Sequence, residues 1–157
     1  MINVGDKLPS VSFQLLTSDG ASNPTTDDLF AGKKVVLFAV PGAFTPTCSE
    51  SHLPGFVVNA DKIKAKGVDS IICLSVNDSF VMNAWGKNSN AEDIIMLADG
   101  GAAFTKAIGL EMDTGDFGGV RSQRYAMIVE DGVVKQLNVE KPKQFEASTA
   151  EAILQQL

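Results

Sequence analysis

The chain has 157 residues, a hydrophobic fraction of 45%, a charged fraction of 20% and a formal net charge of −6. This length and balance are those of a globular protein, and we expect a single domain over residues 1–157. The acidic balance argues against nucleic acid as a partner, because binding a phosphate backbone requires a basic surface.

The first half of the chain alternates between apolar runs and turn signals. Weak alternation predicts an early strand over residues 11–16, which ends at the turn Ser18-Asp19-Gly20. Thr26 or Asp27 is expected to cap one helical turn that ends at Gly32. Three nearly continuous apolar runs are typical of central strands covered on both faces, and they occupy residues 34–40, 71–76 and 94–98.

Helical patterns separate these strands. They cover residues 47–65, 79–87 and 102–108, and the first and third end at glycines. Pro54 lies inside the first of these helices and is expected to kink it, because proline lacks the N–H that the helix needs there.

The C-terminal part predicts a hairpin and a last helix. Strands over 125–129 and 133–139 flank Asp131-Gly132, a tight-turn signal, and Ser148 with Glu151 forms an S-x-x-E capping box. The whole order indicates an α/β fold with a mixed central sheet flanked by helices. A thioredoxin-like arrangement fits this order better than an all-parallel flavodoxin-like sheet, because the hairpin introduces an antiparallel pair.

Two cysteines occur, Cys48 and Cys73, without C-x-x-C or metal-ligand spacing, so both are expected to be free thiols in a reducing compartment. Cys73 lies within an apolar strand, which is typical of inert packing. Cys48 instead follows Pro46 in a Thr/Ser/Pro-rich turn where strand 34–40 leads into a helix. Near a helix N-terminus, exposed backbone N–H groups favour a thiolate, the form that attacks electrophiles.

Other classes of site find little support. The glycine pairs at 100–101 and 118–119 lack nucleotide-binding patterns, and Cys48 with His52 brings no obvious further metal ligand. We therefore expect no cofactor and no metal. The first ten residues do not resemble a signal peptide, and no apolar stretch approaches the ~20 residues that span a bilayer. A cytoplasmic location without membrane contact is expected.

Arginine and histidine could act with Cys48. The two arginines, Arg121 and Arg124, lie just before strand 125–129. A guanidinium suits holding a thiolate or a polarised oxygen pair, although a surface salt bridge is the commoner role. His52 falls on the same helical face as Cys48, which allows a cysteine hydrolase. No third orienting residue is apparent, so we expect His52 to be a structural or supporting residue.

The segment PGAFTPTCSESHLPGF, residues 41–56, resembles the active-site segment of peroxiredoxins, and its P-G-A-F-T-P-T-C form is similar to the type II (peroxiredoxin-five-like) subfamily. The resemblance extends to VGDKLPSV, ICLSVND, FVMNAW, LADG and RSQRYAMIVEDGVV. It implies a thioredoxin fold, a homodimer, and a thiol peroxidase that reduces hydrogen peroxide and small organic hydroperoxides.

The resemblance also implies residue roles. Cys48 becomes the peroxidatic cysteine and Pro41 the residue that shields it. Thr45 becomes the hydroxyl that hydrogen-bonds sulfur and peroxide. Arg124 becomes the guanidinium that favours the thiolate and polarises the O–O bond. The loop that holds Phe117 is expected to contribute to the dimer contact.

One departure from the subfamily concerns the resolving cysteine, which some members carry near the start of the last helix. Ala147 stands at that place here, and Cys73 is a poor substitute. We therefore expect a one-cysteine mechanism, in which an external thiol reduces the Cys48 sulfenic acid: glutathione with glutaredoxin, or thioredoxin. A non-catalytic redox sensor on the same fold is the remaining alternative.

Overall fold

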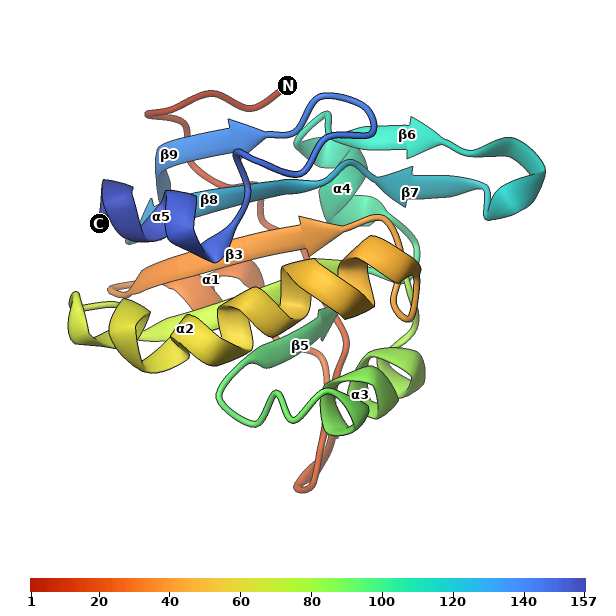
Figure 1. The fold of residues 1–157 in the computed structure, drawn as a ribbon, viewed down its shortest axis with the longest axis horizontal. Coiled ribbons are helices and arrows are strands. Elements are labelled where there is room, and N and C mark those ends of the chain that lie inside the picture. The colour runs from red at the N-terminus through yellow and green to blue at the C-terminus, as the bar shows by residue number, and fades with distance from the viewer.

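The computed structural model describes all residues from 1 to 157, and a five-stranded mixed sheet forms its centre in the order β5-β4-β3-β8-β9 (Figure 1). The strands are β3 Lys34–Val40, β4 Ser70–Ser75, β5 Ile95–Ala98, β8 Tyr125–Glu130 and β9 Val133–Val139. Strands β3, β4 and β5 run parallel, whereas β8 is antiparallel to both β3 and β9. The predicted α/β, thioredoxin-like sheet with one antiparallel hairpin is confirmed.

Helices cover both faces of the sheet (Figure 1). On one face lie α2 Leu53–Ala65, α3 Ser79–Asn88 and α5 Ala150–Gln156, and on the other lie α1 Thr26–Phe30 and α4 Ala103–Ala107. Alternate residues of β3 therefore enter two different apolar clusters: Val36 and Phe38 pack under α2, and Val35 and Leu37 pack under α1 and α4. Burial on both faces explains why this strand is apolar without alternation.

The turn between β8 and β9 follows the sequence prediction. Asp131 and Gly132 both have positive φ, +48° and +76°, as a two-residue type I′ turn requires. Gly and Asp are among the residues that adopt this conformation most readily.

Two small ribbons stand outside the central sheet. One pairs β1 Leu15–Thr17 with β2 Gly20–Ser22, so the early strand is shorter and later than residues 11–16. The other pairs β6 Glu111–Asp113 with β7 Val120–Ser122 and projects from the body of the molecule (Figure 1). Three-residue strands with no apolar alternation carry too little pattern to be predicted.

Both predicted helix caps are wrong: the cap of α1 precedes Thr26 and Asp27, and the cap of α5 follows Ser148. Thr25 caps α1, because its Oγ1 accepts from the Asp28 N–H at 3.2 Å, while the Asp28 carboxylate accepts from the Thr25 N–H at 2.9 Å. Thr149 caps α5, because its Oγ1 accepts from the Ala152 N–H at 3.1 Å. The predicted cap residue, Ser148, is buried, and its hydroxyl donates to Glu140.

Candidate active site

The segment after β3 places Cys48 in the first turns of a helix. Pro41 and Gly42 end the strand, and the helix begins at Pro46, where a missing N–H costs nothing. Residues Cys48–His52 form a π-helical turn, in which the Leu53 N–H donates to the Cys48 carbonyl, before α2 continues as an α-helix. Pro54 has no N–H to complete the ordinary ladder. The sequence predicts that Pro54 kinks this helix. The observed irregularity is a wide turn just before Pro54, and it contains Cys48.

Cys48 is fully buried, and a guanidinium lies directly against its sulfur. Arg124 Nη2 donates to Cys48 Sγ at 3.1 Å. Arg124 precedes β8, so it is held next to the strand that pairs with β3. Arg121 is engaged elsewhere: its Nη1 donates to the Val76 carbonyl at 2.8 Å and its Nε to the Gly118 carbonyl at 3.0 Å. Of the two arginines, Arg124 alone contacts the sulfur.

His52 supports the arginine and does not act on the cysteine. Its Nδ1 accepts from Arg124 Nη1 at 2.8 Å, and its Nε2 donates to the Ser148 carbonyl at 2.9 Å. Because an arginine only donates and a carbonyl only accepts, these partners fix the neutral Nε2–H form of the ring. Burial, helped by the charge of Arg124, lowers the pKa of His52 to about 3. A hydrolase base needs a free nitrogen facing the thiol, so the cysteine-hydrolase alternative is wrong.

A segment from the C-terminal part of the chain holds His52 in place. The Glu140 carboxylate accepts from the Glu146 N–H at 2.8 Å and from both the N–H and the hydroxyl of Ser148 at 2.7 Å. Burial raises the pKa of Glu140, but these hydrogen bonds outweigh it, so the pKa lies below its ordinary value. The Phe145 ring packs edge-on against His52 at 5.1 Å between centroids. The sequence does not predict this support, because no local pattern connects Glu140 or Ser148 with a cysteine more than ninety residues earlier.

Thr45 and Pro41 lie in the loop before the helix. The Thr45 hydroxyl donates to the Gly42 carbonyl at 2.7 Å, so in this structure its proton is directed away from the sulfur. Its oxygen lone pairs remain able to accept. Pro41, Thr47 and Arg124 line a pocket of about 520 Å³, and Arg124 links this pocket to the buried sulfur.

A further polar contact fixes the start of the helix. Trp85 Nε1, from α3, donates to Ser49 Oγ at 3.0 Å, and Ser49 is part of the Cys48–His52 turn. Nothing in the sequence pattern separates this tryptophan from an ordinary core residue.

Cys73 is fully buried in β4, as its apolar surroundings predict. Burial raises the pKa of the Cys73 thiol well above its ordinary value. A thiol that stays protonated is a weak nucleophile, which agrees with the packing role expected of Cys73.

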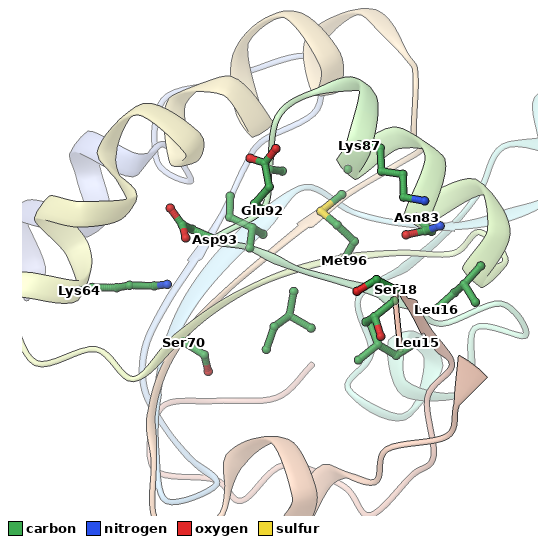
Figure 2. A pocket seen from close by; sticks show the side chains of 15 residues that line it. Leu15, Leu16, Ser18, Lys64, Ser70, Asn83, Lys87, Glu92, Asp93 and Met96 are labelled. Atoms are coloured by element: carbon green, nitrogen blue, oxygen red, sulfur yellow. The ribbon is translucent and has the colours of Figure 1, made fainter. Parts of the chain in front are cut away.

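Another pocket, of about 620 Å³, lies elsewhere, between the end of β1, α3 and the segment before β5 (Figure 2). Two lysines and two acids line it: Lys64, Lys87, Glu92 and Asp93. None of the predicted site residues is among its lining. No group of three or more His, Cys, Asp or Glu side chains is arranged to hold a metal ion, and none of the helices has both the length and the apolar character needed to cross a membrane.

Known proteins match the chain over nearly its whole length. A family model described as Redoxin matches residues 3–154. Among curated relatives, Peroxiredoxin-2E-2, chloroplastic, from Oryza sativa subsp. japonica is 51% identical over 99% of this chain and 72% of its own length. Peroxiredoxin-2B from Arabidopsis thaliana is 47% identical over 99% of this chain and 98% of its own. The chain is a type II peroxiredoxin.

Solved structures agree with this assignment. The crystal structure of reduced Prx3 in complex with H₂O₂ from Vibrio vulnificus is 64% identical, with a TM-score of 0.98 and 99% of each chain covered. Peroxiredoxin 5 from Alvinella pompejana is 38% identical with a TM-score of 0.86 and covers 99% of this chain and 97% of its own. This peroxiredoxin is therefore a thiol-dependent peroxidase, as the sequence predicts.

Proposed function

We propose that Cys48 is the peroxidatic cysteine of this enzyme and that it reduces hydrogen peroxide and small organic hydroperoxides. The observation that carries the proposal is the 3.1 Å hydrogen bond from Arg124 Nη2 to Cys48 Sγ at the start of a helix. A cation and exposed backbone N–H groups both favour the thiolate. The similar Prx3 of Vibrio vulnificus has been crystallised in complex with H₂O₂, which supports the choice of substrate.

In the first step the Cys48 thiolate sulfur attacks one peroxide oxygen, and the O–O bond breaks. The sulfur becomes a sulfenic acid, and the departing oxygen leaves as water or an alcohol after it gains a proton. Charge builds up on that oxygen during the attack, so the Arg124 N–H groups stabilise it most in the transition state. Thr45 Oγ1, which already donates to the Gly42 carbonyl, can accept the peroxide O–H and orient it. Pro41, beside the pocket, keeps bulk water from the sulfur.

The second step needs a thiol from outside the chain. Ala147 offers no sulfur, and Cys73 is fully buried in a strand with a raised pKa. One external thiol attacks the sulfenic sulfur, releases water and forms a mixed disulfide. A second thiol then frees Cys48 and leaves as a disulfide. We propose glutathione with glutaredoxin, or thioredoxin, as this reductant, and a reducing compartment such as the cytoplasm as the place of action.

We also propose that the enzyme is a homodimer. Three large aromatic side chains are exposed, with 51% of Phe44, 71% of Phe80 and 76% of Phe117 accessible. Phe44 lies 6.4 Å from Trp85 of α3, and Arg121 of β7 donates to the Val76 carbonyl just before α3. Phe80 itself lies on α3, and Arg121 also donates to the carbonyl of Gly118, the residue after Phe117. Exposed apolar surface of this kind favours association.

The test compares Cys48→Ser with Cys73→Ser, using peroxide consumption in the presence of each thiol system. We expect Cys48→Ser to abolish turnover and Cys73→Ser to retain most of it. An equal loss in both variants would contradict the one-cysteine mechanism. Slow oxidation of Cys48 without turnover under any donor would instead favour the redox sensor.

A further inference from the structure

The pocket beside Arg124 carries a charge opposite to that of the whole protein. Three cationic side chains, Arg124, Lys141 and Lys143, line it, and Glu140 is its one acidic lining residue. The Glu140 carboxylate already accepts three hydrogen bonds within the 140–148 segment. The chain as a whole has a formal charge of −6, so this cationic cluster is a local feature of the pocket that Arg124 lines.

The two lysines stand on a tight turn with a defined shape. The Gln144 N–H donates to the Lys141 carbonyl at 3.0 Å, and Pro142 and Lys143 occupy the central positions. Lys143 has φ +63°, as the third residue of a type II turn requires. Glycine or asparagine is the usual residue there, because a Cβ is disfavoured in the left-handed region. Lysine at this position adopts an unfavourable backbone conformation, and its charge is held at the pocket, which points to a role in binding.

The turn leads into a residue that contacts both His52 and Arg124. Phe145, the next residue after the turn, packs against the His52 ring, and Arg124 Cζ lies 5.8 Å from the centroid of the Phe145 ring. Gln123 and Gln144 add side-chain amides to the pocket lining. Its volume of about 520 Å³ lies within the roughly 300–1,000 Å³ range of small-molecule sites.

We propose that the turn formed by Lys141–Gln144 is the binding site for the reductant, and that this reductant is a small anionic peptide thiol of the glutathione class, whose carboxylates pair with Lys141 and Lys143. This inference rests on the proposed peroxidase cycle and specifies its second step. The bound thiolate attacks the Cys48 sulfenic sulfur, the S–O bond breaks, and the hydroxide leaves as water after it takes up a proton. The product is a mixed disulfide between Cys48 and the peptide.

The experiment measures the rate of sulfenic acid reduction after Cys48 has been oxidised with one equivalent of hydrogen peroxide. Glutathione is compared with β-mercaptoethanol, a neutral thiol, for the unmodified protein and for the double variant Lys141→Gln/Lys143→Gly. Glycine suits the left-handed position, so this variant keeps its turn while it loses both charges. Lys135→Gln, on β9 and outside the pocket, is the matched control, because its lysine is also exposed.

We expect the preference for glutathione over the neutral thiol to fall about threefold to tenfold in the double variant, since two partly solvated ion pairs are lost. The same preference should fall with added salt in the unmodified protein and stay constant in the double variant. With both lysines changed to glutamate, cysteamine, a cationic thiol, should react faster than glutathione.

Each other outcome overturns the inference in a recognisable way. An unchanged preference in the double variant, or an equal fall in Lys135→Gln, would show that the turn does not bind the thiol. A loss seen with thioredoxin alone would assign the lysines to a protein partner. If peroxide does not oxidise Cys48 of the unmodified protein at all, the proposed peroxidatic role of Cys48 fails, and this inference fails with it.

Discussion

The contact between Arg124 and Cys48 leads to a prediction whose size can be worked from the structure. Arg124 uses two different nitrogens at once: Nη2 donates to Cys48 Sγ at 3.1 Å and Nη1 donates to His52 Nδ1 at 2.8 Å. A lysine has one ammonium group and no planar fork, so Arg124→Lys cannot make both contacts in this geometry. A hydrogen bond that involves a charged group contributes about 1.5–3 kcal/mol. Loss of one such bond from the transition state corresponds to a rate decrease of about 10- to 150-fold.

The assay is single-turnover oxidation of Cys48 by hydrogen peroxide, which isolates the first step from the reductant. Arg121→Lys is the matched control, because Arg121 is also partly buried near the site but donates to the carbonyls of Val76 and Gly118. We expect Arg124→Lys to fall in the range above and Arg121→Lys to lose much less. A larger loss in Arg121→Lys, or a loss below about threefold in Arg124→Lys, would refute the role given to this hydrogen bond.

Two further predictions concern the residues behind Arg124. His52→Gln keeps an acceptor for Arg124 and a donor for the Ser148 carbonyl but does not titrate. The unfolded chain protonates His52 near its ordinary pKa of 6.5 and the folded protein only near a pKa of about 3, so the unmodified protein should lose up to about 1.4 kcal/mol of unfolding free energy per pH unit as the pH falls between these values. Urea titrations at several pH values should show a smaller dependence of the unfolding free energy on pH for the variant. Equal slopes would mean that His52 is not held neutral. Glu140→Gln replaces an acceptor of three hydrogen bonds, and we expect it to lower the unfolding free energy by about 1.5–3 kcal/mol and to slow peroxide oxidation of Cys48, because the Ser148 carbonyl no longer orients His52. Stability loss without any change in the oxidation rate would limit Glu140 to a structural role.

Local sequence determines much of the fold. The apolar run of β3 is predicted with its observed bounds, Lys34–Val40, because a strand that is buried on both faces is a continuous apolar segment whose ends are easy to locate. The β8–β9 turn follows from Asp131-Gly132, the residue pair that its positive φ angles require. The position of Cys48 near a helix start follows from Pro46 and the end of the preceding strand. In each case the cause lies within a few residues of the effect.

Tertiary structure decides the identity of the partners. The residues alone place Arg124 directly before strand 125–129 and Arg121 in a loop, but Arg121 lies in β7. The resemblance favours Arg124, and packing of β8 against β3 places it 3.1 Å from the sulfur of Cys48. The Glu140–Ser148 support has no local signature, and Ser148 even carries a capping-box pattern that the fold does not use, because burial beside Glu140 offers its hydroxyl a better acceptor. Propensity, turn chemistry and apolar patterning act between neighbours in sequence. The hydrogen bonds around Cys48, Arg124 and His52 join residues some seventy to one hundred positions apart, and only the packing of sheet and helices brings those residues together.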